Sequence, residues 1–252
     1  MRSPARWSGR TLVALLIGGL LLAALPSPAL AGPVPANVDY YRTQPSQSFQ
    51  SLTLPTGFFG CGSAAFNRVV VLTGEPLNPA ESSTDTIVRR LETAKFSHPF
   101  PSDATVAIRI EALSLKSFGL PFTVVCGGEP DQLWSFTVGL SPAPQPMGSM
   151  TITHATNDGG TWSASLPVKP LFTFTRVGGG TAPITVDTAV GGSPIAPWTL
   201  MASGVDWTHR APRTLITSNR FCPSCDGGPF GVFFLFSSPS AQLNVEPAFP
   251  AA

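Results

Sequence analysis

Short segments in which apolar and polar side chains alternate recur along the chain after residue 48. In the clearest of them, Val106, Ile108 and Ile110 alternate with Arg109 and Glu111. Because successive side chains of a β-strand point to opposite faces, this alternation predicts a strand with one buried and one solvated face. Segments of this kind, or short apolar runs rich in β-branched and aromatic residues, also lie at residues 68–73, 84–91, 121–126, 133–140, 150–153, 161–166, 172–177, 184–188, 198–202, 214–217 and 230–236.

Turn-forming residues separate these segments, and the Asn-Asp-Gly-Gly sequence at 157–160 is the strongest hairpin signal because Asn and Gly tolerate positive φ. Arg89 and Arg90 stand side by side, which is typical of an edge strand. No segment shows helical periodicity over more than about two turns. We therefore predict an all-β fold, a β-sandwich-like domain or flattened barrel of roughly ten or more short, mainly antiparallel strands.

The spacing of the segments favours a single β-rich domain over residues 48–252. Residues 32–47 contain three prolines and no apolar period, so we expect a flexible N-terminal segment there. The alternative is two β domains divided near residues 141–148, because the proline-rich run at 141–146 has the composition of a semi-rigid linker.

The first 31 residues are organised like a secretory signal peptide. Three arginines and no acidic residue precede the apolar stretch 12–25, Pro26 ends that stretch, and small side chains follow. We predict cleavage after Ala31, so that the mature chain begins at Gly32. A retained membrane anchor is less favoured, because a spanning helix needs about 20 apolar residues. The expected location is secreted, periplasmic or cell-surface, in a bacterial type of cell and with no transmembrane segment after cleavage.

Charge and composition narrow the classes of partner. Charged residues make up 12% of the chain, and the segment after Ala31 has a net charge of −2. Nucleic acid is not an expected partner, because binding to phosphates requires a basic face. The 24 glycines, 27 prolines and 17 phenylalanines suit short strands joined by tight turns around an apolar core.

All four cysteines, Cys61, Cys126, Cys222 and Cys225, follow the predicted signal segment. An even number of cysteines in an exported chain predicts disulfides, and we favour the pairs Cys61–Cys126 and Cys222–Cys225. The Cys-Pro-Ser-Cys sequence also resembles the redox pair of thioredoxin-type oxidoreductases, and four thiolates could bind zinc. The Asp-Gly-Gly-Pro that follows disfavours the helix a redox pair needs, and the isolation of Cys61 and Cys126 disfavours zinc.

No catalytic motif stands out. The histidines, His98, His154 and His209, are scattered, and the chain has no nucleophile elbow, phosphate loop or helical metal-binding motif. An extracellular hydrolase therefore remains an alternative that requires one of these histidines in a pocket beside an acid and a hydroxyl. We expect no cofactor and no metal.

Four tryptophans follow the signal segment. Trp134 and Trp162 lie in strongly alternating segments and are expected in the core. Trp198 and Trp207 lie near prolines and glycines and are candidates for an exposed aromatic surface that binds sugars. The favoured function is a non-catalytic binding, adhesion or surface-structural module, with an extracellular polymer or a surface protein as partner. The alternatives are the hydrolase and a thiol redox protein using Cys222 and Cys225.

Overall fold

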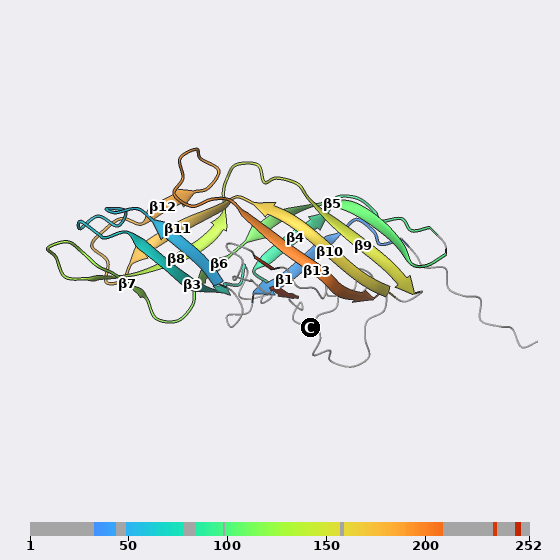
Figure 1. Ribbon diagram of the computed structural model, residues 1–252, viewed down its shortest axis with the longest axis horizontal. Helices are drawn as coiled ribbons and strands as arrows, with labels where there is room; N and C mark the ends of the chain where they lie inside the picture. Colours follow the sequence, from blue (N-terminus) through green and yellow to red (C-terminus); the bar gives the residue numbers. More distant parts are fainter. Residues whose placement is uncertain are drawn as a thin grey trace, which may run out of the picture.

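The structure, a computed structural model, describes residues 33–43, 49–77, 84–97, 99–156 and 159–208, and two short strands at 234–235 and 245–247. The predicted signal segment 1–31, the strand predicted at 214–217, His98, His209, Cys222 and Cys225 lie outside the described residues. The fold is all-β, as predicted: two curled antiparallel sheets contain every described strand (Figure 1). In this part of the chain, no helix is long and apolar enough to cross a bilayer.

The larger sheet has eight described strands, and each neighbouring pair is antiparallel. In spatial order they are β14 (Phe234–Leu235), β13 (Trp198–Thr208), β10 (Gly159–Val168), β9 (Gly148–Thr156), β5 (Ser102–Leu113), β4 (Thr86–Arg90), β1 (Val38–Thr43) and β15 (Val245–Pro247). β9 and β10, on either side of the hairpin predicted at residues 157–160, pair with each other, and Gly159 lies opposite Thr156; residues 157 and 158 lie outside the described part.

The smaller sheet is also antiparallel throughout its described strands. Its order is β12 (Ile184–Asp187), β11 (Pro170–Arg176), β8 (Gln132–Leu140), β6 (Leu115–Ser117), β3 (Phe66–Gly74) and β2 (Phe49–Leu54), with β7 (Phe122–Val124) paired to β8. Among the described strands, β2 and β12 are the two outer strands of this sheet.

The chain moves repeatedly between the two sheets. The connections after β1, β3, β5, β8, β10 and β12 each lead from one sheet to the other, and Figure 1 shows the sheets side by side along the long axis. The proline-rich run is one of these connections. The backbone N–H of Lys169 donates to Gln145 Oε1 at 2.9 Å, which holds this run against the connection between β10 and β11. Strands on both sides of residues 141–148 pair with each other in both sheets, so a domain boundary there would separate paired strands.

Alternation along the strands produces the core, as predicted. In β8, Trp134, Phe136 and Val138 are buried and their neighbours are more exposed. Phe172 and Phe174 of β11 face the same side and pack against Phe136, with ring centroids 5.8 and 5.3 Å away. One cluster of buried apolar side chains includes residues of both sheets.

Two expectations about charged and N-terminal segments are wrong. Val38–Thr43, expected to be flexible, forms β1 and pairs with β4, so β4 lies between β1 and β5 and is not an edge strand. Arg90 points inward, where its Nη1 lies 2.9 Å from Asp39 Oδ1 of β1, and both side chains are 1% exposed. Arg89 points outward and donates to Glu111. The two adjacent arginines suggested an edge strand because the carboxyl group that pairs with the buried Arg90 comes from another strand, β1.

The Cys61–Cys126 disulfide is present and joins the loop between β2 and β3 to the loop after β7. Backbone bonds reinforce this link: Gly127 N–H donates to Cys61 O at 3.0 Å and Ala64 N–H donates to Val125 O at 3.1 Å. The described cysteines therefore form the first of the two favoured pairs.

Candidate functional site

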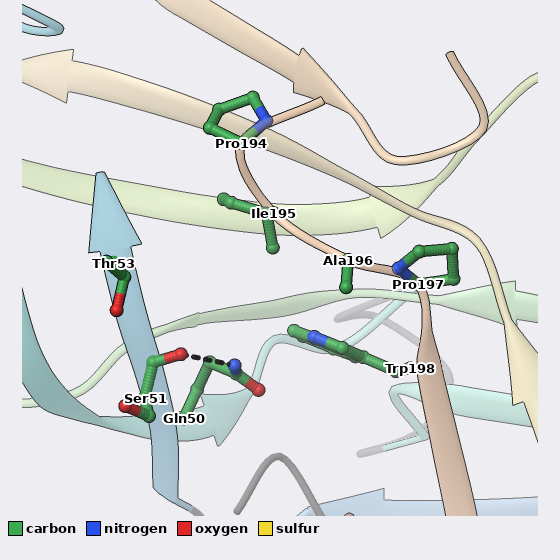
Figure 2. Close-up of a pocket in the computed structure, with 8 residues that line it drawn as sticks. All are labelled: Gln50, Ser51, Thr53, Pro194, Ile195, Ala196, Pro197 and Trp198. Atoms are coloured by element: carbon green, nitrogen blue, oxygen red, sulfur yellow. Dashed lines mark hydrogen bonds between the residues drawn. The ribbon is translucent and has the colours of Figure 1, made fainter. Parts of the chain in front are cut away.

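A pocket of about 290 Å³ lies between β2 and the segment that leads into β13. Strand β2 supplies Gln50, Ser51 and Thr53, and residues 194–198 form the facing wall. Figure 2 shows the Gln50 carboxamide and the Trp198 indole extending towards each other from these two elements. The pocket thus joins the outer strand of the smaller sheet to the start of a strand in the larger one.

Gln50 lies on the inner face of β2. It shares this face with Leu52 and Leu54, which are fully buried, and is itself only 3% exposed. Its Nε2 donates to the backbone carbonyl of Ser51 at 2.7 Å, which orients the carboxamide (Figure 2). The buried Oε1 then has no hydrogen-bond partner in the structure. A buried acceptor in this state costs about 1–3 kcal/mol, so the position favours a polar occupant of the pocket.

Trp198 begins β13 and is 4% exposed. Its ring packs edge-to-face against Phe172, with centroids 5.2 Å apart. The indole Nε1 is buried and, like Gln50 Oε1, has no hydrogen-bond partner in the structure. Ser193 Oγ donates to the Ile195 carbonyl at 2.9 Å and thereby stabilises the turn that brings the chain to Trp198. The pocket therefore contains one unused acceptor and one unused donor.

A second glutamine–tryptophan pair shows how the fold satisfies the same groups elsewhere. In β8, Trp134 Nε1 donates to Gln132 Oε1 at 3.2 Å, and both side chains are buried. Gln50 and Trp198 carry the same carboxamide oxygen and indole N–H at a pocket, yet neither atom forms a hydrogen bond within the protein. This difference identifies the pocket as the best candidate for a binding site.

The chemistry of the lining limits what the pocket can do. The other described lining residues are Ser51, Thr53, Pro194, Ile195, Ala196 and Pro197, so none of the lining side chains that the structure describes is ionisable near neutral pH. General acid–base catalysis needs a positioned titratable group, and a hydroxyl nucleophile needs a base beside it. The described lining therefore offers neutral hydrogen-bonding groups and aliphatic surface, which suits the binding of a neutral group.

Trp198 and Trp207, the candidates for an exposed aromatic surface, are both buried. Trp207 is 3% exposed, its Nε1 donates to the Thr153 carbonyl at 3.0 Å, and its ring packs against His154. Trp198, which lines the pocket, packs against Phe172, and Trp207 also packs against Phe96. The proline- and glycine-rich surroundings suggested exposure, but these contacts bury both rings.

Of the three histidines, the structure describes His154. It is fully buried in β9, stacked on Phe100 with centroids 4.5 Å apart and packed against Phe96 and Trp207. It does not line the pocket. Ser102, its cross-strand neighbour, supplies a nearby hydroxyl. Its ring is enclosed by Phe96, Phe100 and Trp207, none of which lines the pocket. The hydrolase alternative is thus not supported at this residue, while His98 and His209 lie outside the described part.

Sequence reasoning missed Gln50 because a glutamine at the start of an apolar segment carries no recognisable motif. Its only signal is position: Gln50, Leu52 and Leu54 occupy alternate places, which put a polar amide on the buried face of a strand.

Within the described ranges, no group of three or more His, Cys, Asp or Glu side chains is arranged to hold a metal ion. The redox candidates Cys222 and Cys225 are not among these residues. Comparison with known proteins adds no further assignment: no protein-family model, curated protein or solved structure matches this chain significantly.

Proposed function

We propose that this chain is an exported, non-catalytic binding protein whose ligand occupies the pocket between β2 and residues 194–198. The observation that carries the proposal is the pair of buried, unused polar atoms, Gln50 Oε1 and Trp198 Nε1, at one pocket. Binding sites combine apolar surface with placed polar groups that orient the ligand, and this lining contains both, with the larger share polar. The partner is an extracellular polymer or surface protein that presents a neutral polar group.

Export is supported by the N-terminal sequence and by the Cys61–Cys126 disulfide. Structural disulfides persist in oxidising compartments and are rare in the cytosol. The intact mass of the secreted protein tests this part. We expect a chain that begins at Gly32 with no reactive thiol. A retained N-terminus would contradict export, and two readily alkylated thiols would favour the redox alternative at Cys222 and Cys225.

The binding proposal can be tested by nuclear magnetic resonance on the mature, disulfide-bonded protein labelled with 15N. Neutral glycosides form one set of probes, and neutral capped peptides form the other. We expect at least one set to shift signals of pocket residues in a saturable way.

Two variants make this test specific. Ala196→Trp places a large ring at an exposed position of the pocket lining and should abolish the shifts. Ala182→Trp places the same ring at an exposed position in the loop after β11, outside the lining, and should leave them unchanged. If neither set of probes shifts pocket signals, or if both variants behave alike, this pocket is not the binding site.

A further inference from the structure

We propose that the group bound in this pocket is a neutral saccharide, held by hydrogen bonds from Gln50 and Trp198 together with aliphatic contacts. This inference rests on the proposed function and names its ligand class. It differs from recognition by ring stacking, because both rings expected to form such a surface are buried.

The two unused atoms require a ligand that both donates and accepts. Gln50 Oε1 can only accept a hydrogen bond, and Trp198 Nε1 can only donate one. A hydroxyl group does both, and a sugar presents several hydroxyls in fixed positions around a ring. The hydroxyls of Ser51 and Thr53, which also line the pocket, add two groups with the same dual capacity. The hydroxyl groups of a polyol therefore match the hydrogen-bond donors and acceptors of the lining.

A peptide strand fits this place less well. Addition of a strand to a sheet edge depends on free backbone groups of the edge strand. The carbonyl of Ser51 in β2 already accepts a hydrogen bond from Gln50 Nε2. On the facing wall, Pro194 and Pro197 have no backbone N–H to offer. A regular ladder of backbone hydrogen bonds on these two walls would therefore have fewer donors and a carbonyl that is already partly used.

Charge and shape also favour a neutral sugar. None of the eight lining side chains in the described part of the chain is charged, so among them an anionic or cationic ligand would lose hydration without gaining a counterion. Ile195 and the two prolines provide aliphatic surface for the C–H face of a sugar ring. The volume of about 290 Å³ lies at the lower end of the range for small-molecule sites, which suits a single sugar unit.

Trp198 itself supplies the readout. Its indole N–H gives a separate resonance in a 15N spectrum, which the variant Trp198→Phe assigns by its disappearance. The probes are the methyl glycosides of glucose, galactose, mannose and N-acetylglucosamine, with N-acetyl-alanine-methylamide as the peptide probe and glycerol as a non-specific polyol. We expect at least one glycoside to shift the Trp198 signal saturably and to leave the Trp134 signal in place.

Paired glutamine variants test the mechanism. Gln50→Met keeps the length of the side chain but removes Oε1, and should weaken binding of that glycoside about tenfold or more, as expected for loss of a buried hydrogen bond. Gln132→Met removes the equivalent atom from the satisfied pair in β8, and should leave glycoside affinity within about twofold, as expected for a site that shares no contacts with the pocket. Since Gln50 is buried, Ala196→Trp at its exposed position gives a second loss of binding that does not depend on tolerance of a core change.

The outcomes separate this inference from the proposed function. A saturable shift with the peptide probe and none with the glycosides would leave a binding site but refute the saccharide. An equal response to glycerol, or unchanged affinity in Gln50→Met, would also refute it. No response to any probe would refute the binding function as well.

Discussion

The two glutamine–tryptophan pairs allow the energetic contribution of single hydrogen-bonding groups to be measured as a change in the free energy of unfolding. Trp134→Phe removes a satisfied donor and leaves Gln132 Oε1 buried without it, whereas Trp198→Phe removes a donor that has no partner. Both changes delete a similar part of a buried ring. We therefore expect Trp134→Phe to lower the free energy of unfolding by about 1 kcal/mol more than Trp198→Phe does. Urea unfolding of both variants measures the difference. Equal losses would indicate that Trp198 Nε1 is satisfied in solution by a group of the protein.

The buried pair of Asp39 and Arg90 predicts a dependence of stability on pH. Burial raises the pKa of Asp39 from 3.8 to about 7, although the charge of Arg90 opposes the rise. The folded state thus holds this proton more tightly than the unfolded state. The stabilisation that results is complete below about pH 4 and is lost as the pH rises through 7.

Asp39→Asn removes this titration. The stability of the natural protein relative to Asp39→Asn should fall between pH 4.5 and pH 8, by on the order of 2–4 kcal/mol. Urea unfolding of both proteins at the two pH values tests this. A difference that stays constant, or one that grows towards pH 8, would contradict a raised pKa.

At the scale of elements, the disulfide ties two loops that belong to different hairpins. It closes a span of 65 residues, for which loop-closure entropy predicts a stabilisation of about 4 kcal/mol. The double variant Cys61→Ser, Cys126→Ser should lose most of this free energy, measured by urea unfolding without reductant. A loss below about 1 kcal/mol would mean that backbone bonds such as Gly127 N–H to Cys61 O hold the loops by themselves.

The strands differ in how well the alternation of apolar and polar residues predicts them. β5, β8 and β11 were predictable because alternating apolar residues have only one way to bury a face. β1 was not, because its residues Asp39 and Tyr41 become a buried face only when Arg90 of β4 lies beside them. Sequence patterns predict that a charged side chain is exposed unless its partner is known. Here the partners Asp39 and Arg90 are 51 residues apart in the chain.

For the whole molecule, the repeated passage between sheets predicts cooperative unfolding. Trp134 lies in the smaller sheet and Trp162 in the larger one, and both belong to the same buried cluster. Since the chain passes repeatedly between the sheets and both contribute to one buried cluster, unfolding of one sheet would expose core side chains of the other.

The 19F signals of 5-fluorotryptophan at Trp134 and Trp162 should therefore disappear at the same urea concentration, which is a standard test of two-state unfolding. Trp207, at the end of β13, provides a third signal from the larger sheet. Separate midpoints for Trp134 and Trp162 would instead show that the two sheets unfold as independent units.

The sequence by itself determined the all-β class, most strand positions, the faces of the clearly alternating strands and the expectation of disulfides, while the structure decided that Cys61 pairs with Cys126. Period, turn chemistry and cysteine number are local properties that can be read without knowing which strands are neighbours. Only the tertiary structure decided the order of the strands, the burial of Trp198 and Trp207, and the pocket. Gln50 and Trp198 lie far apart in the chain, and whether a polar atom has a partner depends on which distant strand or loop comes to lie beside it.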